Sequence, residues 1–254
     1  MNSTVSFLAP LTAPLTLLRA DWPAPDHVQA YVTTAQANMA LHVGDDPQQV
    51  LQNRAQLMNQ LGVKSIAWLE QKHTTHVVRA ADWQQPPVAD ALWTDEIDRA
   101  IAVMTADCLP VFFTDIKGEK VAVAHAGWRG LLNGVLENTV AAMNILPDQL
   151  IAWLGPAVSQ VAFEVGEEVR AAFIKQNAFA QAAFIPSNRA DHWLADLYQL
   201  ARLRLANLGL TACYGGHYCT YNQADLFYSY RRSAHTGRMA SVIFLNNIPF
   251  PNNL

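Results

Sequence analysis

The stretch "MTADCLPVFFTDIKGEKVAVAHAGWRG", Met104 to Gly130, decides the fold class of this chain. Two apolar runs within it, "LPVFFTD" and "KVAVAHAG", lie on either side of Lys117-Gly118, a pair typical of a turn between antiparallel strands. The residues that follow Gly127 change to helical spacing. A hairpin that leads directly into a helix predicts a mixed α and β domain.

The rest of the chain also alternates short apolar runs with amphipathic helical stretches. The runs 101–104 and 109–115 are expected to be neighbouring strands on either side of the turn "TADC". No internal repeat, low-complexity tract or Gly/Ser linker divides the sequence, which favours a single α/β domain over residues 1–254. We expect helices over 47–62, 131–144, 166–176 and 191–209, of which the last is the longest, and strands within 65–80 and over 101–104, 109–115, 120–127, 150–155, 226–232 and 239–246.

The composition limits the classes of function. With 51% hydrophobic residues, a chain of 254 residues can bury a full core. The formal net charge is −4, only 15% of the residues are charged, and no run of like charge occurs. A nucleic-acid partner is therefore not expected, because phosphate backbones bind to clustered Lys and Arg.

The cysteines and the apolar segments indicate the compartment. The three cysteines Cys108, Cys213 and Cys219 form no C-x-x-C pair, and their odd number suits a reducing compartment better than a disulfide framework. No apolar stretch approaches the roughly 20 residues that span a bilayer. The apolar segment 1–22 has no cation before Arg19 and contains two prolines, so a first strand or an ordered tail is expected rather than a signal peptide. We predict a cytoplasmic protein without a membrane role.

Polar residues gather where the predicted hairpin begins and ends. Cys108 precedes the first apolar run and His125 closes the second, so adjacent strands could bring the two side chains within hydrogen-bond or metal-ligand distance. Either residue alone is more often packed in a core than used as a ligand. The charged neighbours Asp107 and Arg129, and small residues such as Gly127, favour a functional site.

His73, in "LEQKHTTHVV", is a third candidate at a junction of strand and turn. A His, Cys, His set gives zinc three protein ligands and leaves a fourth position for water, as in catalytic zinc sites. His76 is the competing imidazole, but an offset of three residues in an extended strand turns it to the opposite face. The spacings of Cys213, His217 and Cys219 fit no common zinc module, so packing is expected for these residues.

Six motifs spread over most of the chain form a specific combination. They are "NMALHVGDDPQQVLQNR", "LEQKH", "VMTADCLPVFF", "VAVAHAGWRGLLNGVLENTV", "AWLGPAVSQVAFEVGEEVR" and "CTYNQADLFYSYRRSAHTGRMAS". This combination, from about Gln36 to Leu245, closely resembles the YfiH family, also called the laccase-domain or polyphenol oxidase family. The resemblance implies one α/β domain of mixed, stacked sheets covered by helices, with a zinc site whose ligands are His73, Cys108 and His125.

The resemblance also implies an activity. Members of the family are described as acting on purine nucleosides, by phosphorolysis of adenosine, inosine and methylthioadenosine and by deamination of adenosine. Zinc bound by two imidazoles and a thiolate lowers the pKa of its water toward neutrality and so supplies a nucleophile. Two departures from the family pattern stand out: Thr74 replaces the glycine of many members, and the loop "VTTAQANMA", residues 32–40, lacks the arginine usual there.

Further site residues are assigned by their chemistry. Asp107 is the nearest carboxylate for proton transfer, and Arg54 and Arg129 are the nearest cations for phosphate. Asn38 and Asn53 are expected to orient the site through their amides. The alternatives are a turn-capping role for the aspartate, solvated or structural ion pairs for the arginines, and purely structural roles for the asparagines, before or inside a helix. Three aromatic residues of the motifs could stack on a purine but are more often core: Phe163, Tyr228 and Tyr230.

Three other interpretations stay open. A copper-dependent polyphenol oxidase is the first, since copper outcompetes zinc at most nitrogen and sulfur ligands, although the 8 histidines include no H-x-H pair of the kind a multicopper oxidase needs. A cysteine hydrolase would use Cys108 as nucleophile and His125 as base. A noncatalytic or editing role in cell-wall precursor metabolism is the third. The oligomeric state does not follow from the sequence.

Overall fold

The computed structural model describes residues 13–81 and 83–247. These residues form three β-sheets, five α-helices and three short 3-10 helices. Most of the N-terminal segment 1–22 lies outside the described residues, and its described part contains strand β1 (Leu17–Arg19). No helix of the described chain is both long and apolar enough to cross a membrane.

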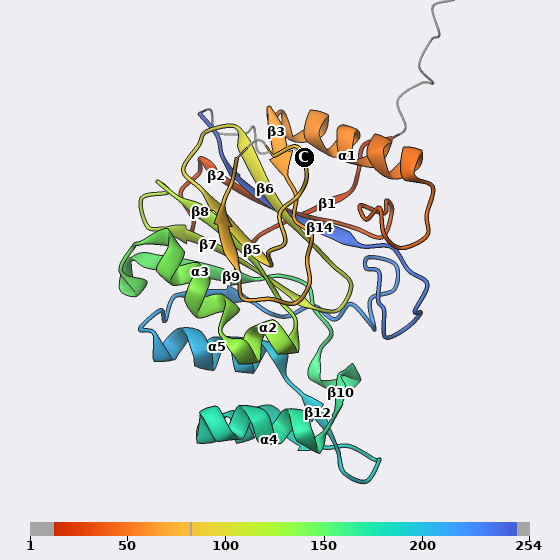
Figure 1. Cartoon of the computed structure of the whole chain (residues 1–254), viewed down its shortest axis with the longest axis vertical. Helices are drawn as coiled ribbons and strands as arrows, with labels where there is room; N and C mark the ends of the chain where they lie inside the picture. Colours follow the sequence, from red (N-terminus) through yellow and green to blue (C-terminus); the bar gives the residue numbers. More distant parts are fainter. Residues whose placement is uncertain (1–12, 82, 248–254) are drawn as a thin grey trace, which may run out of the picture.

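Two large sheets carry most of the structure (Figure 1). Each of the two contains both parallel and antiparallel neighbours. Helices and sheets occur together, so the predicted mixed α and β class is confirmed. The six-stranded sheet has the order β13 (Cys213–Gly215), β9 (Leu150–Leu154), β7 (Leu109–Asp115), β8 (Val121–Ala126), β5 (Ala91–Thr94), β4 (Val77–Arg79). The five-stranded sheet has the order β1, β2 (Val28–Thr33), β14 (Met239–Leu245), β6 (Arg99–Thr105), β3 (Ser65–Ala67).

The two sheets stack face to face, and helices cover their outer faces (Figure 1). In β7, Phe112 belongs to the core between the sheets, whereas Val111 and Phe113 belong to the core under the helices, because successive side chains of a strand point to opposite faces. Leu57 and Leu61 attach a helix to the far side of the five-stranded sheet. That helix is α1 (Pro47–Leu61), and the six-stranded sheet is covered by α2 (Trp128–Asn133), α3 (Val135–Met143) and α5 (Leu197–Asn207).

A small third sheet and helix α4 (Glu167–Gln176) lie beyond α5, at the lower end of Figure 1. Phe173 and Phe184 pack against each other and belong to the same apolar core as α3 and α5, so this unit continues the helical layer. The sheet has the order β10 (Glu164–Gly166), β12 (His192–Ala195), β11 (Phe184–Pro186). The 3-10 helices are η1 (Pro147–Gln149), η2 (Gln160–Ala162) and η3 (Ala178–Ala183).

Several local predictions are confirmed. Strands β7 and β8 form the expected antiparallel hairpin, and Gly118 in its turn has φ +71°, a conformation that favours glycine. Helix α1 begins after Asp46, whose carboxylate accepts a hydrogen bond from the backbone N–H of Gln48, and it ends before Gly62, which has φ +65°. Helix α4 and strands β9 and β14 also lie where they were expected.

Two helix predictions are wrong. The stretch 191–209 begins as strand β12, and α5 starts only after Asp196, whose side chain caps the helix by accepting from the N–H of Gln199. Pairing of β12 with β10 and β11 therefore overrides the helical spacing, and the longest helix is α1. The stretch 131–144 is divided between α2 and α3, because Gly134 between them has φ +100°.

Two strand predictions are also wrong. The runs 101–104 and 109–115 lie in different sheets, since β6 pairs with β14 and β3 whereas β7 pairs with β8 and β9. The turn "TADC" therefore crosses from one sheet to the other. The stretch 226–232 forms turns and irregular backbone instead of a strand. The guanidinium of Arg232 donates to the carbonyls of Thr220 and Phe227, which therefore pair with a side chain and not with a neighbouring strand.

Candidate functional site

Cys108 and His125 meet at one end of the β7–β8 hairpin. Val123 points to the core between the two sheets, and the two-residue period of a strand gives His125 the same direction. Pro110 pairs with His125, and continuation of this register places Cys108 opposite Gly127, diagonal to the histidine. The site thus lies where the layer between the sheets opens.

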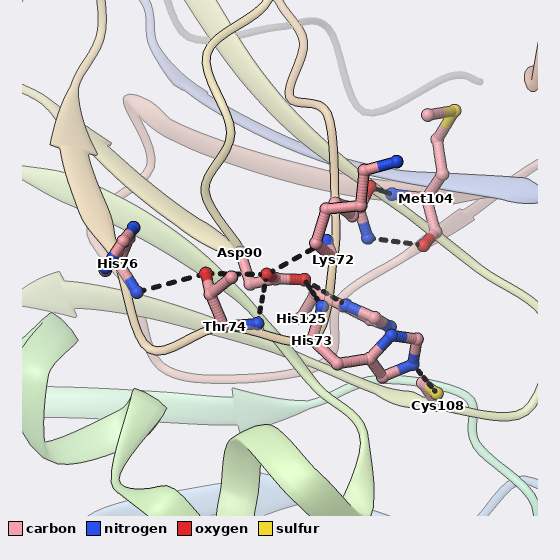
Figure 2. A network of polar contacts seen from close by, with 9 residues as sticks. Lys72, His73, Thr74, His76, Asp90, Met104, Cys108 and His125 are labelled. Atoms are coloured by element: carbon pink, nitrogen blue, oxygen red, sulfur yellow. Dashed lines mark hydrogen bonds and ion pairs between the residues drawn. The ribbon is translucent and has the colours of Figure 1, made fainter.

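His73 reaches this pair from the loop between β3 and β4. Its backbone is in the left-handed region, with φ +58°, and its Nε2 lies 3.7 Å from the Sγ of Cys108. The ring centroids of His73 and His125 are 4.8 Å apart, and the three ligand atoms all lie within 4.8 Å of one another. His76 is exposed and lies on the far side of the network in Figure 2. The structure brings His73, Cys108 and His125 together and leaves His76 out.

The carboxylate of Asp90 joins the two histidines (Figure 2). Its Oδ1 accepts from the Nδ1–H of His125 at 2.8 Å and from the backbone N–H of His73 at 3.0 Å. Its Oδ2 accepts from the backbone N–H of Lys72 and from the N–H and hydroxyl of Thr74. The Asp90 side chain is fully buried, so it fixes both the loop that carries His73 and the orientation of the His125 ring.

The electrostatics of the cluster favour a thiolate. Burial opposes ionisation of Cys108, but His125 and then His73 outweigh burial and lower the pKa of the thiol to about 6. Burial also opposes protonation of His125, whereas Cys108 and Asp90 raise the pKa of this imidazole to about 9. For Asp90, burial raises the pKa, and the hydrogen bonds from His125 and Thr74 outweigh it and lower the pKa to about 2. The thiolate is the form of cysteine that binds metals.

The donor set fits a zinc ion with one open position. Two imidazoles and a thiolate are common zinc ligands, and in a tetrahedral site such ligands lie roughly 3.3–3.8 Å apart. The three atoms lie within 4.8 Å of one another, so only small side-chain movements are needed to reach this geometry. No second group of this kind occurs in residues 13–81 and 83–247, and Cys213 packs against the apolar core as expected.

Gly127 leaves room for the ligands. A Cβ atom at this position would lie 2.8 Å from Cδ2 of His73 and 2.9 Å from Sγ of Cys108. We expect Gly127→Ala to displace both ligands and to weaken zinc binding, since overpacking of this kind costs about 1–3 kcal/mol. Titration with zinc against a chromogenic chelator measures the affinity. Gly130→Ala is the matched control, because its Cβ would make only ordinary contacts, the shortest 3.4 Å, and unchanged affinity in Gly127→Ala would contradict the prediction.

The three side chains lie in a pocket of about 370 Å³, a size typical of small-molecule sites. The pKa of His42, which lines this pocket, is lowered by burial and further by the charges of Arg238, Lys72 and Arg54. The effect of these three cations on His42 indicates a positive electrostatic potential in the pocket. The cationic and aromatic side chains of the lining include Arg129, Arg231, Arg238, Trp128, Phe163 and Tyr230.

Asp107 lines the pocket, but both of its carboxylate oxygens are engaged. They accept from the hydroxyl of Thr220 and from the backbone N–H of Arg231, each at 2.6 Å. The residue is buried and has φ +93°, a strained conformation for a non-glycine residue. Its side chain therefore ties the turn "TADC" to the C-terminal loops, which also contribute residues to the pocket lining.

The structure separates the two arginines expected to bind phosphate. Arg129 lines the pocket and is exposed, with its guanidinium over the ring of Trp128. Arg54 does not line this pocket. Its Nε donates to the carbonyl of Met39, and its guanidinium lies 4.0 Å from the ring centroid of Trp68.

Asn38 and Asn53 are buried and do not line the pocket. The Oδ1 of Asn38 accepts from the backbone N–H groups of Ala40 and Arg238, and the Nδ2 of Asn53 donates to the carbonyl of Asn38. These amides act on the pocket indirectly, because they hold the backbone of Arg238, a residue of its lining.

Several residues of the site escape prediction from the sequence alone. Asp90 lies between apolar residues in "VADALW", and no motif there marks a carboxylate that bonds to the histidine of another strand. Arg231 and Arg238 lie within the longest family motif, which was the one available signal for them. Of the three motif aromatics, Phe163 and Tyr230 line the pocket and Tyr228 does not.

Comparison with known proteins gives matches over most of the chain. Residues 28–246 match the family described as multi-copper polyphenol oxidoreductase laccase. A purine nucleoside phosphorylase of Pseudomonas aeruginosa is 48% identical over 240 residues, which cover 91% of this chain and 98% of that protein. Purine nucleoside phosphorylase YfiH of Escherichia coli K12 is 46% identical over 242 residues, which cover 90% and 98%.

Solved structures share the fold. The crystal structure of a Neisseria meningitidis protein, 48% identical, superposes with a TM-score of 0.88 and covers 91% of this chain and 99% of that chain. YlmD from Geobacillus stearothermophilus, 26% identical, gives a TM-score of 0.85 and coverage of 94% and 98%. The stacked sheets described above are therefore common to these proteins.

Proposed function

The chain belongs to the YfiH family of laccase-domain proteins, and we propose that it is a zinc-dependent enzyme of purine nucleosides. The resemblance drawn from its motifs is confirmed by the family match over residues 28–246. The proposed substrate class comes from the relatives, which are named purine nucleoside phosphorylases. We further propose a cytoplasmic location, in keeping with three free cysteines.

The observation that carries the proposal is the meeting of His73, Cys108 and His125 in a pocket of about 370 Å³. One thiolate and two imidazoles suit zinc, and three protein ligands leave a position open to substrate. Phe163 and Tyr230 add aromatic surface of the kind that packs against a purine.

The proposed reactions are phosphorolysis of adenosine, inosine and methylthioadenosine, and deamination of adenosine. Bound zinc would supply a Lewis acid that polarises oxygen or activates water. Asp90 orients the His125 ring, and Arg129 offers a cation to phosphate from the exposed rim. Asp107 holds the backbone of Arg231 in place, and its further role in proton transfer stays a prediction.

The test is zinc analysis joined to product analysis. Protein purified without added metal is assayed with inosine or adenosine, with and without phosphate, and the products are separated by chromatography. We expect close to one zinc per chain, release of hypoxanthine or adenine that depends on phosphate, and inosine formed from adenosine without phosphate. Removal of zinc by a chelator abolishes both reactions, and added zinc restores them.

The outcomes separate the parts of the proposal. Zinc-bound protein that converts none of these nucleosides would overturn the substrate class and would favour a binding or editing role. Phosphate-dependent release without deamination would restrict the proposal to phosphorolysis. Turnover that survives complete removal of metal would overturn the zinc requirement.

A cysteine hydrolase is the second candidate, because Cys108, His125 and Asp90 lie in the order nucleophile, base and orienting carboxylate. His73 beside the same thiol favours a metal instead, since a hydrolytic dyad does not need a second imidazole. Full activity after chelation, lost on alkylation of the thiol, would establish the hydrolase. The same metal analysis shows whether copper, the metal of the oxidase interpretation, takes the site.

A further inference from the structure

Three arginines line the pocket, and none of them forms an ion pair with a carboxylate of the described chain. They are Arg129, Arg231 and Arg238. Elsewhere in the protein, arginine commonly has an acidic partner: Arg79, Arg99, Arg170, Arg189 and Arg204 each pair with an aspartate or a glutamate. The three arginines therefore give the pocket a positive charge that no ion pair with a carboxylate of the described residues neutralises.

Each of the three guanidinium groups lies over an aromatic ring instead. Arg129 lies 4.3 Å from the ring centroid of Trp128, and Arg231 lies 4.9 Å from that of Phe163. Arg238 lies 5.8 Å from the ring centroid of Tyr230. Contact of this kind holds the plane of a guanidinium and leaves its N–H edges able to bind an anion in a bidentate manner.

The pocket offers no competing carboxylate. Asp107 is its one acidic lining residue, and both oxygens of Asp107 already accept hydrogen bonds from Thr220 and Arg231. The backbone N–H of Arg231 makes one of these bonds, so its guanidinium is not involved. An anionic ligand would therefore meet three cations and no free carboxylate.

Arg238 is the best fixed of the three. Its backbone N–H donates to Asn38, and its Nη1 donates to the carbonyls of Thr236 and Gly237. Its Nε and Nη2 have no hydrogen-bond partner among the described residues. The side chain is half-buried, so an anion bound to these two atoms would be partly shielded from water, which strengthens the interaction.

We propose that Arg129, Arg231 and Arg238 form an oxyanion subsite that holds inorganic phosphate beside the His73–Cys108–His125 cluster. The proposal rests on the proposed function and deepens it by naming the residues that bind the second substrate. In the reaction, a phosphate oxygen forms a bond to the ribose C1′ while the bond from C1′ to the purine nitrogen breaks. The electron pair of that bond goes to the purine, which then takes up a proton. Three guanidiniums place the phosphate and offset its charge, and Arg54 takes no part.

The test compares Arg238→Gln and Arg238→Lys with the wild type in zinc-replete protein. Binding of inorganic phosphate is measured by calorimetry, and the KM for phosphate is measured with inosine in excess. We expect Arg238→Gln to lower the affinity for phosphate and to raise the KM for phosphate, each by about 10- to 100-fold. This is the effect of removing hydrogen bonds to a charged group. Arg238→Lys restores only part of the affinity, because lysine keeps the charge but lacks the planar fork. The KM for inosine changes less than the KM for phosphate.

Two further variants keep the test decisive. Arg129→Gln changes an exposed side chain, so it tests the subsite even if Arg238→Gln folds poorly. Arg79→Gln is the matched control, since Arg79 also lies over a ring, that of Trp93, but pairs with Asp95 and does not line the pocket. Unchanged phosphate affinity in both Arg238→Gln and Arg129→Gln would overturn the subsite. Phosphate binding that depends on Arg238 in a protein without turnover would keep the subsite and overturn the proposed function instead.

Discussion

Cys108→Ser is expected to yield a folded protein that neither binds zinc nor turns over nucleosides. The thiolate is one of three proposed zinc ligands, and serine at this position would have to bind zinc through a hydroxyl that remains protonated at neutral pH. We expect zinc affinity to fall by more than about 100-fold, beyond the usual effect of changes in groups that only support the ligands. Zinc content after dialysis and the two product assays measure this loss.

The control for Cys108→Ser is Cys219→Ser. Cys219 is also partly buried and accepts a hydrogen bond from the hydroxyl of Ser159, but it lies outside the pocket that holds the ligands. Cys219→Ser should keep its zinc and its activity. Retention of zinc and full turnover by Cys108→Ser, with circular dichroism like that of the wild type, would show that the thiol is not a ligand.

Asp90→Asn is expected to weaken both the metal site and the fold. The carboxylate accepts five hydrogen bonds, whereas an asparagine amide would turn an N–H₂ group toward donors of the same kind. Removal of one partner of a buried pair costs about 3–5 kcal/mol of stability, and loss of the group that orients a ligating histidine costs about 10- to 100-fold in metal affinity. Urea unfolding of the metal-free protein measures the first effect, and zinc titration measures the second.

Two variants accompany Asp90→Asn. Asp95→Asn removes a carboxylate from the exposed pair with Arg79 and should cost little, because exposed ion pairs contribute less than about 1 kcal/mol. Thr74→Ala removes one of the five hydrogen bonds to Asp90 and should give a smaller effect of the same kind. If Asp90→Asn bound zinc as tightly as the wild type, the carboxylate would not be what orients His125.

The central hairpin could be predicted because its signals are local. The apolar runs of β7 and β8 and the glycine between them specify an antiparallel pair, and the two-residue period then turns Cys108 and His125 to one face. Helix α1 was predicted for a similar reason, since its capping aspartate and its final glycine lie at its own ends. Each of these features depends on neighbours in the sequence.

Other features depend on residues far apart in the chain. No spacing rule links a loop before β4 to a hairpin further along the chain. The choice of His73 over His76 therefore needed support from the family resemblance. Asp90 joins the two histidines only after β5 has paired with β8. The sequence of strand β12 predicts the start of a helix. Its strand partners β10 and β11 are only three residues long, so they give little sequence signal of their own. The loop at 226–232 is shaped by the guanidinium of Arg232 and by the hydrogen bond from the backbone N–H of Arg231 to Asp107, neither of which leaves a periodic signal.

Strand β14 lies between β2 and β6 in the five-stranded sheet, although it follows both in the sequence. A ribosome therefore releases β2 and β6 long before the strand that joins them, and each carries an open edge in the meantime. The nascent chain already contains all three proposed metal ligands and Asp90 at this stage, whereas Arg238 arrives immediately before β14. Synthesis thus delivers the residues of the proposed metal site first, and the segment that closes the sheet with β14 also brings Arg238 to the pocket lining.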